Sequence, residues 1–532
     1  MNLSLYSNLT SIPSFWLFFI SCLLFSTKRL FRYLRFLQQD AYLPKRFVEW
    51  LWKEQAYDKK GTAIALLSAI LPSKWSLEVC AFLLLLITFL ENNPLREGKL
   101  KLQLTPRAKR IAAIAFILYL PLQILSAFYL ASFFGQLLIF QSLPFLLIAS
   151  LYLLSYDESR RQKILIKGAK QKLKKIDPYV IGITGSYGKT STKDALGQLL
   201  QITLGSTFWP SKGINTDMGI TRSIRERLEP LTKYAVIEMA AYGTGSIRRL
   251  CGLTPPHAGI ITGIGLAHLD RFGDQKTIYQ AKSELAQAIP EEGILICNGD
   301  NPGTRQISAE FKKQTTLLYG LDNSKRDLDC WITPLELTKE GTRFRIEWEG
   351  KSFEGITSLY GNTSLSNCAG AFAMACALGA QPDFAAAALS TLIPVNNRLQ
   401  ISRDEERTYI HDAYNSNPEG FLSALHVLHQ MPARKRILMT PGMIELAEQN
   451  LNMHHKVGYQ AAKVCDLAIL VGKTNRESLS LGLIAGGFTQ SQIITAEHRS
   501  EAFEKLAAVM EKGDAVLIEN DLPDLYEHKE SF

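Results

Sequence analysis

The sequence lacks the cysteine patterns that indicate a disulfide framework or a zinc module. Its 532 residues contain only 8 cysteines, which are scattered and form no C-x-x-C pair. It also lacks internal repeats and low-complexity tracts. Hydrophobic residues make up 47% of the chain, and this fraction excludes an intrinsically disordered protein. These features indicate a folded protein of three or four domain-sized parts in a reducing compartment.

Charged residues are missing from two long stretches, residues 1–27 and residues 111–156. A helix needs about 20 residues to cross a bilayer. We therefore expect one anchor near the N-terminus and two crossings in the second stretch, with a break near Gly135–Gln136. The first basic cluster follows the apolar run instead of preceding it, so the pattern favours an anchor over a cleaved secretory signal. Basic residues flank both stretches (Lys28, Arg29, Arg32, Arg35; Arg107, Lys109, Arg110; Arg160, Arg161, Lys163).

The segment between these stretches leaves two alternatives open. Residues 61–90 are apolar except for Lys74 and Glu78, with Pro72 between two short halves. In the first alternative they enter the membrane, as an even number of crossings or as a re-entrant hairpin. In the second they form a buried or interfacial hairpin. Residues 28–60 mix basic and aromatic residues, which is typical of an amphipathic segment at the headgroup level.

We therefore predict a membrane region over residues 1–160 with three to five transmembrane helices, in the cytoplasmic membrane of a bacterium. Residues 1–175 contain 24 Lys and Arg against 9 Asp and Glu, and the rest of the chain contains 35 against 41. The excess of basic residues at the apolar spans places the remaining domains in the cytoplasm. Because these charges bracket apolar spans, we expect a lipid bilayer and not a nucleic acid as the partner.

Short apolar runs alternate with helical patterns from about Ile176 onward. Strands are predicted at 179–184, 235–240, 258–264 and 293–297, and a second series at 408–411, 436–439, 467–471, 493–495 and 515–518. This alternation predicts an α/β fold with parallel sheets. We expect a P-loop-type central domain at 176–395, with a small β excursion at 339–358, and a Rossmann-like C-terminal αβ domain at 396–532.

A glycine-rich turn follows the first of these strands, in the sequence TGSYGKTS at 184–191. Gly185 and Gly188 let backbone N–H groups surround phosphate oxygens at the start of a helix. Lys189 can reach the terminal phosphates, and the Thr190 hydroxyl can bind Mg²⁺. The turn therefore predicts an ATP site, although a purely structural glycine turn is the alternative.

Three further residues are candidates for a metal site. Glu238 ends an apolar strand, where ligands bind in open α/β sheets, and a carboxylate there can coordinate Mg²⁺. His268 follows another strand, and Lys282 lies on a predicted helix. Taken singly, a strand-end carboxylate, a lone histidine and a helical lysine are each commonly structural or solvated.

The order of these motifs resembles the Mur ligase family over residues 176–520. The resemblance rests on TGSYGKTS, KGINTDMG (212–219), EMAAYGTGSI (238–247), TGIGLAHLDRFG (262–273), QAKSEL (280–285), NGDNP (298–302) and HDAYNSNP (411–418). HDAYNSNP and MIELAEQNLNMHHKVG (443–458) are most similar to the member that adds D-alanyl-D-alanine to UDP-N-acetylmuramoyl-tripeptide. Membrane segments stand in place of that member's N-terminal uridine-nucleotide domain.

The resemblance implies an ADP-forming ligase that activates a carboxylate with ATP and then forms an amide with an amino acid or dipeptide. It implies that Lys189, His268 and Lys282 are catalytic and that Lys282 becomes a carbamate. It places Thr190, Glu238, His268 and Lys282 at Mg²⁺, and Asn215, Tyr414, Asn415 and Asn417 near the substrates. The implied nucleotide contacts are Thr184, Gly185, Gly188, Lys189, Thr190, Ser191, Asn367, Arg398 and Asp412. Peptidoglycan precursor synthesis is the implied pathway, with a UDP-N-acetylmuramoyl peptide or a lipid-linked acid as acceptor.

The sequence departs from the family pattern at three positions. Thr363 and Ser364 replace a histidine and an asparagine beside the adenine contact, and Glu519 stands where the family has a basic residue. These departures leave two alternatives open. One is a ligase acting on a folate-like or polyglutamate-like acid, and the other is an ATP-binding membrane scaffold without catalysis.

Overall fold

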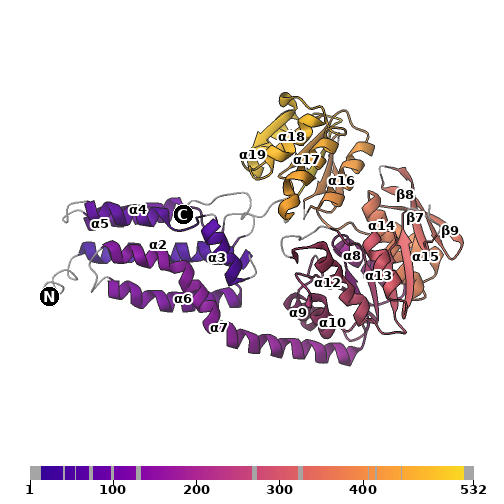
Figure 1. The fold of residues 1–532 in the computed structure, drawn as a ribbon, viewed down its shortest axis with the longest axis horizontal. Coiled ribbons are helices and arrows are strands. Elements are labelled where there is room, and N and C mark those ends of the chain that lie inside the picture. The colour runs from indigo at the N-terminus through magenta and orange to yellow at the C-terminus, as the bar shows by residue number, and fades with distance from the viewer. Residues whose placement is uncertain are drawn as a thin grey trace. The chain divides into compact units, whose positions relative to one another are not determined.

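The computed structural model separates the chain into two compact units, residues 1–161 and residues 162–522. The structure describes residues 13–39, 42–53, 55–70, 76–96, 101–126, 133–211, 213–265, 272–321, 327–338, 340–404, 406–413, 416–444 and 446–520. Figure 1 shows the N-terminal unit as a set of helices and the second unit as two sheets covered by helices. The predicted α/β class with parallel sheets, preceded by a helical region, is therefore confirmed.

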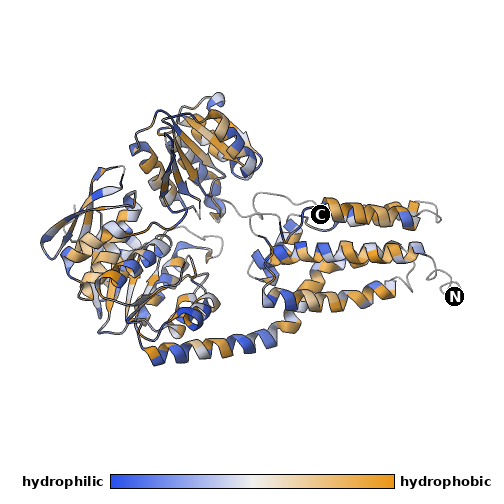
Figure 2. Ribbon diagram, turned by 180° about the vertical axis from the view of Figure 1, so that it is seen from behind, coloured by the Kyte–Doolittle hydropathy of each residue, from blue (hydrophilic) through white to orange (hydrophobic). Residues whose placement is uncertain are grey.

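The N-terminal unit is built from long apolar helices. Its elements are α2 (Pro13–Gln39), α3 (Pro44–Lys53), α4 (Lys59–Ile70), α5 (Ser76–Leu90), α6 (Pro106–Leu125) and the first part of α7 (Phe133–Ile176). Figure 2 shows the hydrophobic colouring of these helices, which becomes mixed in the second half of α7. Within the part of the chain that the structure describes, three helices are long and apolar enough to cross a membrane, namely α2, α6 and α7 from Ile139.

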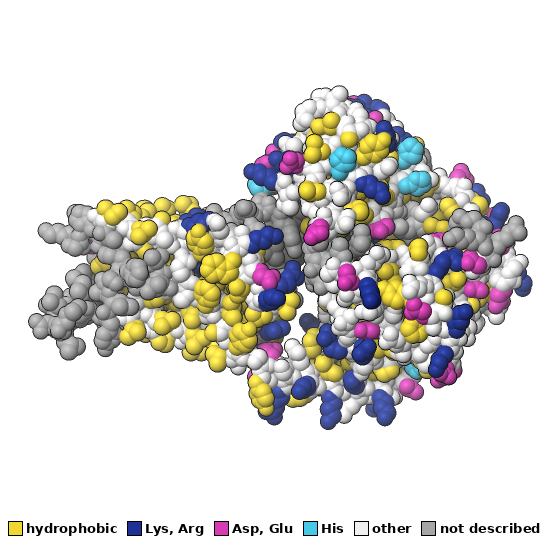
Figure 3. Space-filling model, viewed as in Figure 1, with side chains coloured by type: hydrophobic (Ala, Val, Ile, Leu, Met, Phe, Trp, Pro, Cys, Tyr) yellow, Lys and Arg dark blue, Asp and Glu magenta, His cyan; other side chains and the backbone are white. Residues whose placement is uncertain are grey.

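The outer surface of this unit is apolar as well as its interior. Phe89 is 78% exposed and Ile117 is 65% exposed, and Figure 3 shows hydrophobic side chains along the visible flank with Lys and Arg gathered at one end. Large apolar residues that face outward on several helices are typical of a surface in contact with lipid.

The predicted break near Gly135–Gln136 is wrong. Both residues lie inside α7, and α6 ends earlier, at Leu125. A glycine costs a helix interior only about 1 kcal/mol, so in a long apolar run it does not decide where the helix stops. Within residues 61–90 the structure describes two helices, α4 up to Ile70 and α5 from Ser76, of which α5 is the more apolar.

A buried ion-pair network joins three helical segments of the N-terminal unit. The Arg29 side chain on α2 is 1% exposed, and its Nε donates to Asp58 Oδ2 at 3.0 Å. Arg29 and Lys60 also bind Glu91 at the end of α5, the latter with Nζ and Oε1 2.7 Å apart. Buried charges need such partners, because an unpaired one is costly. The network therefore fixes α2 against the start of α4 and the end of α5.

The first sheet of the second unit has nine strands in the order β2-β3-β1-β4-β5-β6-β7-β8-β9. Their bounds are β1 (Tyr179–Thr184), β2 (Thr207–Phe208), β3 (Tyr234–Glu238), β4 (Ala258–Ile261), β5 (Ile294–Asn298), β6 (Thr315–Gly320), β7 (Cys330–Leu337), β8 (Thr342–Trp348) and β9 (Lys351–Thr357). In this spatial order, each pair of neighbouring strands from β2 to β7, including those with β1, is parallel. The pairs β7–β8 and β8–β9 are antiparallel. The expected β excursion is thus an extension of the main sheet.

Helices cover both faces of this sheet, as the alternating pattern predicts. One face packs α8 (Lys189–Thr203), α14 (Asn362–Ala377) and α15 (Pro382–Ala388). The other packs α9 (Asp217–Arg227), α10 (Ser246–Leu253), α12 (Gln275–Ala288), α13 (Pro302–Glu310) and the end of α7. Strand β1 lies between β3 and β4, so the loops after these strands meet at one edge.

The second sheet of this unit has six strands in the order β10-β11-β15-β12-β13-β14. Their bounds are β10 (Gln400–Arg403), β11 (Thr408–Asp412), β12 (Arg436–Thr440), β13 (Leu467–Val471), β14 (Ile493–Ala496) and β15 (Ala515–Glu519). One face packs α16 (Pro418–Gln430), α17 (Asn450–Ala461) and α18 (Arg476–Ala485), and the other packs α19 (Arg499–Val509). Short 3-10 turns lie at Leu389–Thr391, Ala447–Gln449 and Gln490–Gln492.

The apolar helices predict that the protein stays in the membrane when electrostatic contacts are weakened. After washing membranes with 1 M NaCl or alkaline carbonate, we expect the full-length chain in the pellet, because salt screens charges and leaves apolar burial intact. Immunoblotting of pellet and supernatant measures this, with detergent as the positive control for release. Complete release by salt would contradict an integral anchor.

Candidate functional site

The loop between β1 and α8 has the geometry of a phosphate-binding loop. Gly185 and Gly188 have φ angles of +153° and +77°. A Cβ atom on Gly185 would lie 2.1 Å from the Thr262 hydroxyl, and one on Gly188 would lie 2.5 Å from the Asn367 side chain. Helix α8 begins at Lys189, so its free N–H groups face this loop. The backbone can therefore approach phosphate oxygens closely.

The Lys189 side chain lies over the same loop. Its Nζ donates to the backbone carbonyl oxygens of Gly185 at 2.7 Å and Ser186 at 3.2 Å. Removal from water lowers the pKa of Lys189 to about 8, the charge of Glu238 opposes this shift, and the charge of Arg398 adds to it. A bound polyphosphate would favour the protonated form, because it supplies opposite charge to a desolvated cation.

Glu238 is held at the carboxyl end of β3 by three groups from neighbouring elements. Its Oε2 accepts a hydrogen bond from Thr190 Oγ1 at 2.8 Å, and its Oε1 accepts one from Asn215 Nδ2 at 2.8 Å. Lys193 Nζ lies 3.9 Å from Oε2. Glu238 is 1% exposed and Lys193 is fully buried. The carboxylate therefore has a fixed position beside the phosphate loop.

The donor set at this point suits Mg²⁺. The Thr190 hydroxyl and the Glu238 carboxylate supply hard oxygen atoms, which are the ligands this ion prefers. Both side chains are buried at the mouth of the loop that would hold the phosphates. The structure thus brings together two of the four predicted metal-site residues, and their role as ligands stays a prediction.

Lys282 is buried on α12, where a lysine of a solvated helix face would be exposed. It is 2% exposed, and its Nζ lies 5.9 Å from the centre of the Phe272 ring. Burial lowers the pKa of Lys282 well below its usual value, with a further contribution from the charge of Lys189 and opposition from Glu238. The surface interpretation of Lys282 is wrong. His268 lies outside the described residues.

Two predicted nucleotide contacts reach the loop from other elements. Arg398, in the segment between the two sheets, donates from Nη2 to Thr190 Oγ1 at 3.2 Å. Asn367, on α14, accepts a hydrogen bond from Thr192 Oγ1 at 3.0 Å. The Thr190 hydroxyl therefore links Arg398 to Glu238.

Asp412 and Glu519 form a pair of neighbouring carboxyl groups at the ends of β11 and β15. The two residues are partners in the parallel register. Asp412 Oδ1 accepts a hydrogen bond from the Leu399 N–H at 3.2 Å, and Glu519 Oε1 accepts one from Ser416 Oγ at 2.5 Å. Burial raises the pKa of Asp412 to about 7, and burial together with Asp412 raises the pKa of Glu519 well above its usual value.

Other predicted site residues have local structural partners. Thr184 Oγ1 donates to the Met239 carbonyl at 2.8 Å. Asn417 caps α16 and accepts a hydrogen bond from the Gly420 N–H at 2.9 Å. Ser191 lies in the first turn of α8, and Tyr414 and Asn415 lie outside the described residues. The substrate and nucleotide roles of these residues stay predictions.

Lys193 is a site residue that the sequence analysis did not identify. It lies one helical turn after Lys189, on the side of α8 that faces Glu238, and its Nζ is also 3.6 Å from Asp194 Oδ2. The sequence did offer one signal, because Lys193 follows Lys189 by four residues and this spacing places both lysines on the same side of the helix. Its complete burial, which only the packed structure reveals, distinguishes it from a solvated lysine.

Comparison with protein families matches residues 183–375 to the Mur ligase middle domain and residues 397–519 to the Mur ligase, glutamate ligase domain. The UDP-N-acetylmuramoyl-tripeptide–D-alanyl-D-alanine ligase of Mycobacterium tuberculosis is 32% identical over 362 residues, which are 64% of this chain and 69% of that protein. MurF from Acinetobacter baumannii has a TM-score of 0.60 at 26% identity, over 68% of this chain and 77% of that one. MurF from Thermotoga maritima, solved with ADP, has a TM-score of 0.60 at 25% identity, over 69% and 82%.

The contact between Lys193 and Glu238 predicts a stability effect. We expect Lys193→Ala to lower the melting temperature by about 6 °C, because it leaves a buried carboxylate without its cation. In a Glu238→Gln background the same substitution should cost less, since only Asp194 then remains for Lys193 to balance. Thermal unfolding of the full chain in detergent measures both, with exposed Lys351→Ala as the control. Equal losses in the two backgrounds would contradict the pairing.

Proposed function

Because this chain belongs to the Mur ligase family of ATP-dependent, ADP-forming ligases, we propose that it joins D-alanyl-D-alanine to the carboxylate of a UDP-N-acetylmuramoyl peptide. The names of its relatives support this choice of substrates. The observation that carries the proposal is the buried arrangement of Lys189, Thr190 and Glu238 around the loop after β1. This arrangement favours catalysis over an inert scaffold.

In the first step, an oxygen of the acid substrate attacks the γ-phosphorus of ATP, an acyl phosphate forms, and ADP leaves. The loop N–H groups and Lys189 hold the phosphates, and Asn215 and Arg398 lie close enough to Glu238 and Thr190 to orient the acid. A magnesium ion, bound by Thr190 and Glu238, would supply charge neutralisation at the transferred group.

In the second step, the amine attacks the acyl carbon, the bond to phosphate breaks, and an amide remains. The two sheets meet at the site through Arg398 and through a hydrogen bond of 3.1 Å between Thr363 and Ser423. Thr363, which stands in place of the histidine of the family pattern, thus links α14 directly to α16. Closure around the acyl phosphate protects it from hydrolysis.

Lys282 fits the carbamate that the resemblance implies. A carbamate forms when a neutral amine attacks CO₂ and loses a proton, so the lowered pKa of Lys282 favours the reactive form. The product is an anion, which suits a buried position near the charge of Lys189 better than a further cation does.

The proposal also places the ligase at the cytoplasmic membrane. The three apolar helices of the N-terminal unit support an anchor, and the basic excess of residues 1–175 favours the cytoplasm for the rest of the chain. A lipid-linked acid would be accessible to an anchored enzyme and remains the alternative acceptor.

The proposed reaction predicts ADP formation that depends on both substrates. With MgATP and UDP-N-acetylmuramoyl-tripeptide, we expect D-alanyl-D-alanine to stimulate phosphate release, and Lys189→Ala to lower kcat/KM by about 100-fold, because a transition-state charge contact is lost. A coupled phosphate assay measures this, with exposed Arg343→Gln as the matched control. Background release from the wild-type protein with these substrates would refute the assignment.

The carbamate predicts a signal specific to Lys282. With ¹³C-bicarbonate, we expect a carbamate resonance in the ¹³C spectrum of the wild-type protein and none in Lys282→Ala. The variant should lose most ligase activity, whereas ATP binding measured by calorimetry should persist. An active Lys282→Ala enzyme, or a wild-type spectrum without the resonance at saturating bicarbonate, would contradict the carbamate.

A further inference from the structure

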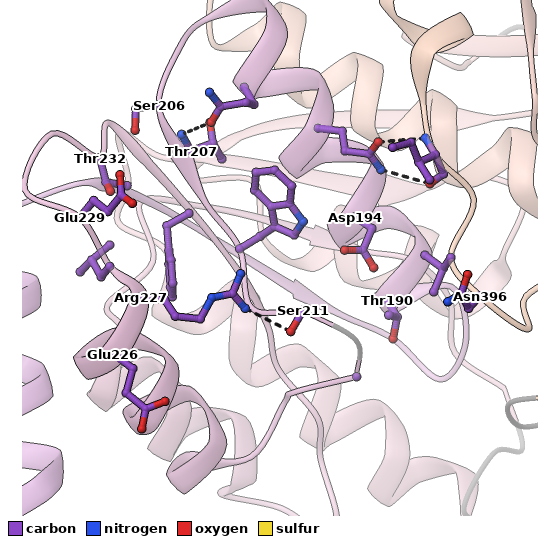
Figure 4. Close-up of a pocket in the computed structure, with 18 of the residues that line it drawn as sticks. Thr190, Asp194, Ser206, Thr207, Ser211, Glu226, Arg227, Glu229, Thr232 and Asn396 are labelled. Carbon is purple, nitrogen blue, oxygen red and sulfur yellow. Dashed lines mark hydrogen bonds between the residues drawn. The ribbon is translucent and has the colours of Figure 1, made fainter.

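A cavity of about 1180 Å³ lies beside edge strand β2, and none of the predicted substrate residues lines it. Figure 4 shows its walls. It begins beside Thr190 and Arg398, at the carboxyl ends of the strands, and it extends to Ser206 and Thr232, which precede β2 and β3. We call it the edge groove. It runs from the proposed reaction centre along the side of the sheet.

One wall of the edge groove is a polar face of α8. Thr190, Asp194, Gln198 and Gln201 follow the helical spacing that places residues on one side. The eleven steps from Thr190 to Gln201 span about 16 Å of helix. Gln198 also binds the backbone of Ile393 on the opposite wall, accepting from its N–H at 2.9 Å. This length exceeds what a lone carboxylate needs.

Two side chains give the edge groove a definite chemistry. The Trp209 ring packs against α8 at Gly197, where a Cβ atom would lie 2.5 Å from the ring. Arg227 Nη1 donates to Ser211 Oγ at 3.1 Å, as Figure 4 shows. A fixed aromatic ring offers a face for a sugar or another ring, and a held guanidinium suits a carboxylate or phosphate.

Three acidic residues line the edge groove, and two of them pair with cations that do not line it. Glu226 accepts from Arg222 Nε at 2.8 Å, and Asp194 lies 3.6 Å from Lys193. The third is the exposed Glu229. Arg227, by contrast, has no carboxylate partner among the residues that the structure describes. The groove therefore retains a cation available to an anionic group of a ligand.

The nucleotide does not account for this space. Of the nine predicted nucleotide contacts, only Thr190 and Arg398 line the edge groove. Asn367 and Ser191 line a smaller, adjoining cavity beside the start of α14, which shares Asp194, Gln198 and Arg398 with the edge groove. The edge groove thus begins at Thr190, where the γ-phosphate is expected, and leads away from Asn367, the predicted adenine contact.

We propose that the edge groove holds the body of the acid substrate, an elongated sugar- and peptide-bearing acid with a second anionic group. Its reactive carboxylate lies at Thr190, its hydrogen-bonding groups lie along α8, a ring packs on Trp209, and the second anion binds Arg227. The proposal rests on the proposed function and specifies where this chain, which has helices in place of a nucleotide-sugar domain, holds that substrate.

Steady-state kinetics of the full-length enzyme in detergent test the assignment. With UDP-N-acetylmuramoyl-tripeptide as the probe, Arg227→Gln and Trp209→Ala should each raise the KM for the acid about tenfold. The KM for ATP, the KM for D-alanyl-D-alanine and kcat should stay within about twofold. Arg343→Gln, an exposed arginine on β8, is the matched control.

The outcomes separate this assignment from the proposed function. An active wild-type enzyme whose KM for the acid is unchanged by Arg227→Gln overturns the edge-groove assignment and leaves the function standing. A rise in the KM for ATP of the same size overturns it as well, because the groove would then serve the nucleotide. A wild-type enzyme that does not turn over this acid refutes the proposed function, and the assignment with it. Arg227 is exposed, so its substitution tests the proposal even if Trp209→Ala fails to fold.

Discussion

The site depends on one buried carboxylate. Glu238 lies at the end of strand β3 with almost no access to water, so the fold must supply partners for its charge. It obtains them from α8, through Thr190 and Lys193, and from the segment before α9, through Asn215. Each of these contacts fixes an element relative to the phosphate loop. The same carboxylate that would bind a metal therefore organises the loop around it.

The basic side chains near this carboxylate outnumber the acidic ones. This excess of positive charge suits the binding of a polyphosphate. Lys189 and Lys282 each have a lowered pKa, because water has been removed from both, and a neighbouring cation adds to each shift, Arg398 for Lys189 and Lys189 for Lys282. Such a cluster is costly in an empty site and favourable around a highly charged anion. A carbamate on Lys282 would relieve part of the repulsion by changing the sign of one charge.

The C-terminal sheet shows the opposite arrangement. Asp412 and Glu519 lie side by side where strands β11 and β15 end, and both carboxyl groups have raised pKa values. Glu519 replaces a basic residue of the family pattern, and Ser416 satisfies one of its oxygens. The pair therefore retains protons more readily than isolated acids, and it reduces the repulsion that two full charges would create next to each other.

The sequence by itself determined the fold class, the bounds of β1 at Tyr179–Thr184, and the phosphate loop, because periodicity and glycine placement are local properties. It also predicted long apolar segments, but their ends were set by packing, so the break expected at Gly135–Gln136 lies inside α7. Strands β2, β6, β7 and β10 escaped prediction; β2 is two residues long and β10 is a short edge strand. Only the tertiary structure decided that Lys193 is buried beside Glu238, that Lys282 is buried as well, and that Trp209, Arg227 and α8 line one groove. The physical reason is that burial and charge balance depend on which elements meet across the sheet, and residues distant in sequence carry no local signal of that meeting.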